Sequence, residues 1–88
     1  MKDLEISIHH SVGLHARPAT LFVQTARKYK SDIKVAYKDT STDGKSFLGL
    51  LNLSITKDAI IHISADGEDE EIALNDLKNL IENDFSGR

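Results

Sequence analysis

The sequence contains no cysteine and only one proline among its 88 residues. The absence of cysteine excludes disulfides, thiolate chemistry and zinc sites of the cysteine type, and it fits the reducing environment of the cytoplasm. No run of residues approaches the roughly 18 apolar residues that a membrane span needs. The first five residues are charged where a signal peptide would be apolar. We therefore expect a cytoplasmic protein that does not insert into a membrane.

The sequence also has fewer basic residues than acidic ones, 11 against 14, so the net charge is −3. Such a balance argues against nucleic acid as a partner, since the phosphate backbone selects basic surfaces. The sequence has no Walker loop for a nucleotide and no glycine-flanked serine of the nucleophile-elbow type. No carboxylate pair stands out either, because the acidic residues fall mostly on predicted surfaces. These features predict no cofactor and disfavour hydrolysis.

What the chain does contain is the composition of one small globular domain covering residues 1–88. Hydrophobic residues make up 40% of the chain and charged residues 28%, which is ordinary for such a protein. A chain of this length supports one modest core and leaves no room for a second domain. It shows no internal repeat, linker or low-complexity segment.

Apolar periodicity divides the chain into elements in the order β-α-β-β-α-β-α. Alternation predicts strands over about 2–8, 33–37 and 60–65, and a turn near 39–41 leads to a short edge strand that merges into Lys45. Apolar stripes predict helices over about 16–28 and 47–53, and a last helix after the acidic run 68–71. The pattern indicates an α+β fold in which helices cover one side of a four-stranded, mainly antiparallel sheet. Periodicity alone leaves ferredoxin-like arrangements open.

The segment 13–19, Gly-Leu-His-Ala-Arg-Pro-Ala, places a histidine, a cation and a helix start directly after the first strand. His15 falls at the predicted N-cap, beside unpaired N–H groups and the positive end of the helix dipole, and Pro18 fixes the helix start. An anion there would meet the N–H groups of Ala16 and Arg17 and the planar guanidinium of Arg17. A neutral imidazole can also attack phosphorus. Spacing alone fits equally well a partly buried histidine in an ordinary strand-to-helix turn.

The predicted second helix carries more apolar residues than one buried stripe needs. Ser46 is a good N-cap for this short helix. Exposed apolar patches tend to mark interaction sites. We therefore expect Phe47, Leu48 and Leu51 to form a partly exposed patch near His15, on which partners dock.

Three histidines, His9, His10 and His15, lie close together in the sequence and raise the question of a metal. Their spacing is not the i, i+4 pair of a helical zinc motif, and no carboxylate lies near them in sequence to complete a coordination set. We therefore predict no metal site, with His9 and His10 as solvated residues at a strand end. His62 falls on the polar face of its strand and is expected to be exposed.

The segment 13–19 resembles the active-site motif of the HPr family, the histidine-containing phosphocarriers of the bacterial sugar phosphotransferase system. Residues 45–51, Lys-Ser-Phe-Leu-Gly-Leu-Leu, resemble the regulatory serine region of that family, and the resemblance covers essentially all 88 residues. It implies the HPr open-faced β-sandwich, with three helices on one side of the sheet, and a monomeric carrier rather than an enzyme. It also implies that His15 accepts a phosphoryl group from enzyme I and passes it to sugar-specific IIA components, with Arg17 and the backbone of Ala16 and Arg17 stabilising the phosphate.

The resemblance further implies that Ser46 is a regulatory phosphorylation site, served by an HPr kinase/phosphorylase and read by a transcriptional regulator. One departure touches the active site: Val12 stands where many relatives carry a small polar residue able to meet the phosphate, so phosphohistidine stability is expected to differ. Two other hypotheses remain open, a regulatory paralogue in catabolite control or nitrogen-branch signalling and a small anion-binding α+β domain with a structural His15. The presence of both His15 and Arg17 favours the carrier.

Overall fold

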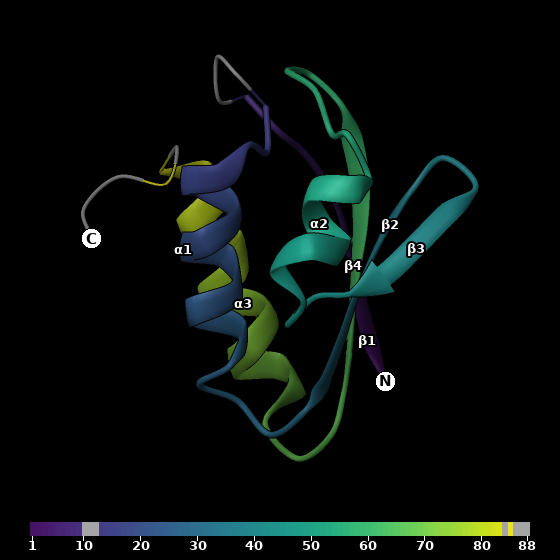
Figure 1. The fold of residues 1–88 in the computed structure, drawn as a ribbon. Coiled ribbons are helices and arrows are strands. Elements are labelled where there is room, and N and C mark those ends of the chain that lie inside the picture. The colour runs from purple at the N-terminus through teal and green to yellow at the C-terminus, as the bar shows by residue number, and fades with distance from the viewer. Residues whose placement is uncertain (10–12, 84, 86–88) are drawn as a thin grey trace.

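Alternating apolar residues form the four strands of this computed structural model, which describes residues 1–9, 13–83 and 85. The sheet has the order β1-β4-β2-β3, and every neighbouring pair is antiparallel (Figure 1). The sheet matches the predicted four-stranded, antiparallel α+β arrangement, and its strand order, which the sequence left open, joins no two strands in parallel. The strands are β1 (Lys2–Ser7), β2 (Asp32–Tyr37), β3 (Thr40–Asp43) and β4 (Ile60–Asp66).

The register of the strands gathers the apolar side chains on one face of the sheet. Ile63 of β4 lies opposite Leu4 of β1 on one side and opposite Val35 of β2 on the other. Because side chains alternate along a strand, Ile61 and Ala65 point to the same face, and both are at most 1% exposed. This row forms the sheet side of the core.

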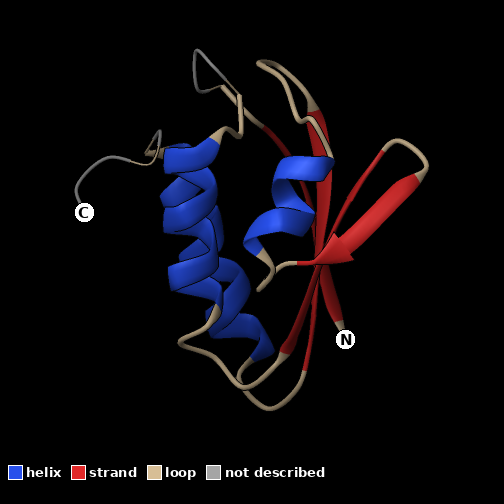
Figure 2. Ribbon diagram, in the orientation of Figure 1, coloured by secondary structure: helices blue, strands red, loops and turns tan. Residues whose placement is uncertain are grey.

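Three helices cover that face of the sheet, and the opposite face carries none of them (Figure 2). Each helix buries the stripe that its periodicity predicts: Phe22 in the first, Leu50 in the second and Leu77 in the third are all fully buried. None of the helices in the described residues is long and apolar enough to cross a membrane. The predicted open-faced β-sandwich is confirmed. The helices are α1 (Ala16–Ala26), α2 (Phe47–Asn52) and α3 (Glu70–Glu82).

The polar hairpin between β2 and β3 differs from its prediction at both ends. Lys38 adopts a left-handed backbone with φ of 57°, so a turn of only two residues suffices, and Tyr37 pairs directly with Thr40. The edge strand ends at Asp43 instead of merging into Lys45. The chain turns there because Asp43 accepts two hydrogen bonds from the residues that follow, one from the Lys45 N–H to its carboxylate over 2.9 Å and one from the Ser46 N–H to its carbonyl over 3.0 Å.

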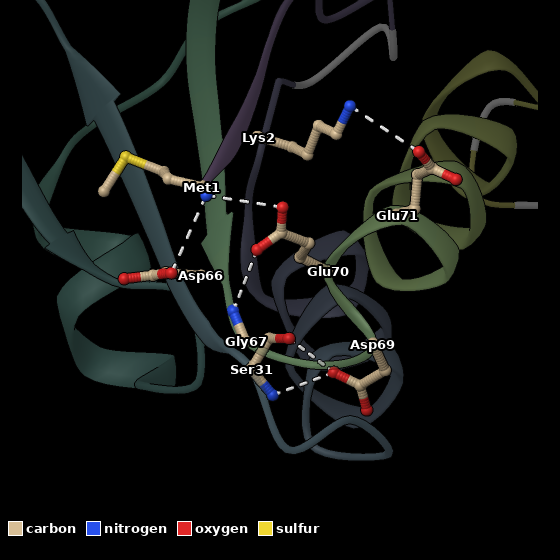
Figure 3. Close-up of polar contacts among 8 residues, drawn as sticks. All are labelled: Met1, Lys2, Ser31, Asp66, Gly67, Asp69, Glu70 and Glu71. Carbon is tan, nitrogen blue, oxygen red and sulfur yellow. Dashed lines mark hydrogen bonds and ion pairs between the residues drawn. The ribbon is translucent and has the colours of Figure 1, made fainter.

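The N-terminal end of α3 is tied to the loop between α1 and β2 (Figure 3). The carboxylate of Asp69 accepts hydrogen bonds from the N–H groups of Lys30 (2.8 Å) and Ser31 (3.0 Å) and from the Ser31 hydroxyl. These bonds, the Ser31 hydroxyl first, hold the pKa of Asp69 below its ordinary value of 3.8. They also satisfy the hydroxyl of Ser31, which is fully buried.

The same end of α3 also receives the start of the chain (Figure 3). The Glu70 carboxylate accepts a hydrogen bond from the Gly67 N–H over 3.0 Å and lies 3.4 Å from the amino group of Met1. The Gly67 hydrogen bond is the main cause that lowers the pKa of Glu70. The carboxylates at this end thus hold a loop and the chain start against one helix.

Candidate functional site

His15 stands at the junction between the first strand and α1, held there from behind by the loop after α2. Gly13 has φ of +70°, and a Cβ at this position would lie 2.4 Å from the carbonyl oxygen of Ile55. The N–H of the buried Leu14 donates to that same carbonyl over 3.0 Å. A close approach of this kind requires glycine. His15 is therefore turned outward on a fixed support, and its side chain is exposed.

The N-terminal end of α1 carries hydrogen-bond donors that have no partner among the described residues. His15 is the N-cap with an extended backbone, yet its imidazole makes no capping hydrogen bond. The first intrahelical bond runs from the Ala19 N–H to the His15 carbonyl over 2.8 Å, so the N–H groups of Ala16 and Arg17 precede the hydrogen-bonded ladder. The first turn holds no acidic residue, and the side chain of Arg17 is exposed. This end of α1 can receive an anion beside a nucleophilic nitrogen.

The loop after α2 completes the surroundings of His15. The two helices α1 and α2 contact each other, and α2 runs toward the end where α1 begins (Figure 1). His15 and Leu51 line a small hollow together with Ser54 and Thr56. The hollow is therefore lined by an apolar residue of α2, by two hydroxyl-bearing residues and by His15.

Ser46 lies at the opposite end of α2 from this hollow. Its hydroxyl caps the helix by accepting the Gly49 N–H over 3.0 Å, as expected of an N-cap serine. Arg27, at the C-terminal end of α1, donates from Nε to the Lys45 carbonyl over 3.2 Å. Lys45 in turn donates from Nζ to the Tyr29 carbonyl over 2.8 Å. Ser46 thus sits beside the end of α1 that is farthest from the helix start.

The apolar residues of α2 are divided between core and surface. Leu50 is fully buried, Phe47 and Leu51 are half-buried, and Leu48 is 69% exposed. Leu51 shares the hollow with His15. Phe47 begins the helix at its other end, next to Ser46. The structure therefore brings one of the three predicted docking residues to His15 and spreads the others along α2.

The other histidines that the structure describes, His9 and His62, each lie beside a different carboxylate. The exposed His9 is 3.5 Å from a carboxylate oxygen of Asp58, and the exposed His62 is 3.7 Å from one of Glu5. His10 lies outside the described residues, and so does Val12. Over residues 1–9, 13–83 and 85, no group of three or more histidine and acidic side chains is placed to hold a metal ion.

Sequence reasoning missed Ser54 and Thr56. Their only signal in the sequence is that they follow the apolar run of the second helix. Nothing in that position indicates which side chain they would approach, because the contact depends on how α2 packs against α1. The structure alone assigns them to the surroundings of His15.

Comparison with known proteins agrees with this geometry. A family model described as the PTS HPr component phosphorylation site matches residues 2–83. The phosphocarrier protein HPr of Neisseria meningitidis is 40% identical over 85 residues, which cover 97% of this chain and 96% of that protein. The crystal structure of HPr-C-His from Thermoanaerobacter tengcongensis has a TM-score of 0.96 at 42% identity and covers 100% of this chain and 99% of its own. That of the Bacillus subtilis catabolite repression protein Crh, described as a dimer with a swapped domain, has a TM-score of 0.76 at 32% identity and covers 96% and 97%.

Proposed function

This chain belongs to the HPr family of the phosphotransferase system, whose members are phosphocarriers and not enzymes, and we propose that His15 is the residue that carries its phosphoryl group. The observation that supports this most directly is the exposed imidazole of His15 at the open end of α1. It has no hydrogen-bond partner within the described part of the chain. The anion site and the nucleophile therefore coincide.

The chemistry of the transfer follows from the groups at this end of α1. A ring nitrogen of neutral His15 attacks phosphorus, a nitrogen–phosphorus bond forms, and the bond to the donor breaks with its electron pair left on the donor. The N–H groups of Ala16 and Arg17 and the guanidinium of Arg17 stabilise the phosphoryl oxygens. We propose that the donor is phospho-enzyme I and that sugar-specific IIA components take the group in the reverse manner.

The test is phosphorylation by phosphoenolpyruvate and enzyme I. The wild-type protein is expected to form an acid-labile, base-stable adduct, and H15A none. H15A should stay folded, since an N-cap residue contributes about 1 kcal/mol and His15 makes no capping bond. The matched control is H62A, which removes an exposed histidine from the open sheet face and should label as the wild type does. Labelling of folded H15A would end the proposal.

We also propose that the exposed side of α2 docks these partners, with Phe47, Leu48 and Leu51 as its apolar contacts. L48D should weaken enzyme I binding strongly with little change in stability, because Leu48 is 69% exposed. The matched control is I72D, which alters a residue of α3 that is 65% exposed and should leave binding unchanged. Equal affinity of L48D and the wild type would refute the docking surface.

Ser46 is proposed as a regulatory phosphorylation site, phosphorylated by an HPr kinase/phosphorylase and recognised by a transcriptional regulator. It is half-buried and lies beside Arg27 and Lys45, cations that suit an added dianion. A phosphate there would have to be desolvated when a partner covers α2, so transfer to His15 should slow. The kinase should label the wild type and not S46A, and S46D should lower the rate at which enzyme I phosphorylates His15.

A carrier must offer one face to several partners in turn, so we propose that the chain works as a single-domain monomer in the bacterial cytoplasm. Its relatives include the dimeric Crh, which makes the oligomeric state a separate question. Analytical ultracentrifugation at micromolar concentration should give the mass of one chain. A concentration-independent dimer would contradict the proposal.

A further inference from the structure

Ser54 occupies a backbone conformation that a side chain makes costly. It follows the C-cap of α2 with φ of 55°, and its N–H donates to the Leu51 carbonyl over 3.1 Å. This left-handed position after a helix is the one that glycine favours, since glycine has no Cβ to clash. A serine is present here although a glycine would fit the turn with less strain.

The fold makes no use of the Ser54 hydroxyl that could account for the serine. The hydroxyl forms no hydrogen bond with any other described residue, and the side chain is exposed. Ser54 nevertheless lines the hollow that holds His15 and Leu51. A strained residue that persists at a functional site points to a role in that site.

We propose that the Ser54 hydroxyl donates a hydrogen bond to an oxygen of the phosphoryl group on His15. The proposal deepens the phosphocarrier function and rests on it. A phosphoryl group offers three strong acceptor oxygens, and the backbone donors that α1 places beside it are those of Ala16 and Arg17. Val12, which precedes the segment 13–19, supplies no side-chain donor, because the side chain of valine cannot hydrogen-bond. Ser54 supplies that donor from a different loop.

Thr56 provides the matched control, because it also carries a hydroxyl and lines the same hollow. Its backbone is not in the left-handed region, so no strain has to be explained there. T56V removes this hydroxyl with almost no change in shape. S54G removes the Ser54 hydroxyl and relieves the backbone, so it should fold at least as stably as the wild type.

The experiment measures the equilibrium constant for phosphoryl transfer from phospho-enzyme I to wild type, S54G, S54A, S54N and T56V. All five should label at His15. S54G and S54A should lower the equilibrium constant by about 5-fold, which is the effect expected from the loss of one ordinary hydrogen bond. T56V should match the wild type. S54N should retain much of the wild-type constant, because asparagine tolerates the left-handed backbone and its amide can donate.

A phosphorus NMR spectrum of each phosphorylated variant supplies a readout that a purely structural role would not move. The phosphohistidine resonance should shift in S54G and stay in place in T56V. If the variants label and S54G transfers and resonates as the wild type does, the hydrogen bond is refuted while His15 remains the carrier. If T56V lowers the constant and S54G does not, Thr56 is the donor and the proposal is wrong. A wild type that fails to label refutes the carrier function itself.

Discussion

The N-terminal ends of α1 and α3 lie at opposite ends of the molecule and meet the same electrostatic problem in different ways (Figure 1). Each end presents N–H groups that have no partner within the helix, together with the positive end of a helix dipole. At α3 the chain answers with its own carboxylates, Glu70 and Glu71 in the first turn and Asp69 at the N-cap. At α1 the first turn holds no acidic residue and the N-cap is a histidine. The side chain of neither N-cap forms a capping hydrogen bond.

The carboxylates at the end of α3 stabilise the fold, whereas the end of α1 keeps its donors available for the proposed ligand. The carboxylates of α3 bind the loop at Lys30 and Ser31 and the amino group of Met1. The end of α1 is instead supported from behind, through Gly13 and Leu14 against Ile55. Because the support comes from the backbone, the donors in front need no partner from the chain, as the proposed binding of a phosphoryl group at His15 requires.

The largest expected effect comes from giving α1 the acidic first turn of α3. A16E should stabilise the helix by about 0.3–1 kcal/mol. It should also slow phosphorylation of His15 at least about 10-fold, because charges about 4 Å apart repel by more than 1.4 kcal/mol near a protein surface. The measurement is the initial rate of labelling by enzyme I, with Q24E as a control of equal charge farther along α1. Equal rates for A16E and Q24E would show that the open end is not the phosphate site.

The next effect removes the support behind α1. A Cβ at Gly13 would lie 2.4 Å from the Ile55 carbonyl oxygen, and the backbone is left-handed there. G13A should therefore lower the free energy of unfolding by about 1–3 kcal/mol and also reduce labelling of His15. Urea denaturation and the labelling assay measure the two losses. G67A is the control, because it disturbs the end of α3, where Gly67 also has a positive φ, and should reduce stability without slowing transfer by folded molecules.

The carboxylates at the N-terminal end of α3 should make the stability of the protein depend on pH. The hydrogen bonds of Ser31 and Lys30 hold the pKa of Asp69 below 3.8. A carboxyl with a lowered pKa in the folded state contributes stability that is complete above its ordinary value and is lost as the pH falls through the folded value. D69N should thus be less stable than the wild type at neutral pH, and the gap should narrow below about pH 4. The control D39N changes an exposed turn residue. A difference in stability between D69N and the wild type that stays constant with pH would contradict the assignment.

The smallest effect concerns α2, whose N-terminal end is closed by a hydroxyl. Ser46 accepts the Gly49 N–H over 3.0 Å, so S46A should cost about 1 kcal/mol. S46N, which keeps a capping oxygen, should restore most of this loss. Thermal unfolding measures both variants, and an S46A protein as stable as the wild type would mean that the capping bond adds nothing.

Much of this arrangement could be predicted from local patterns. Alternation such as Ile61, Ile63 and Ala65 identified a strand with one buried face, and the stripe through Phe22 identified α1. These patterns work because burial of one face is a local property of a strand or helix. The position of His15 at a helix start followed from Pro18 in the same way.

The remainder depends on packing between distant segments. The helices α1 and α2 run in opposite directions (Figure 1), with Leu51 at the His15 end and Ser46 at the other, and no local pattern in the sequence indicates this packing. The role of Ser54 beside His15 depends on the same packing. The two-residue turn at Lys38 was missed because a lysine at positive φ contradicts ordinary propensity.

The opposite directions of α1 and α2 also fix how far Ser46 lies from the hollow at His15. The six residues of α2 span roughly 9 Å, and this length separates the hollow at His15 from the serine at the far end. If Ser46 carries the proposed phosphate, a partner that contacts only the hollow does not touch it. A partner that covers the full length of α2 contacts both ends, so the breadth of its contact would decide whether it responds to the proposed phosphate on Ser46.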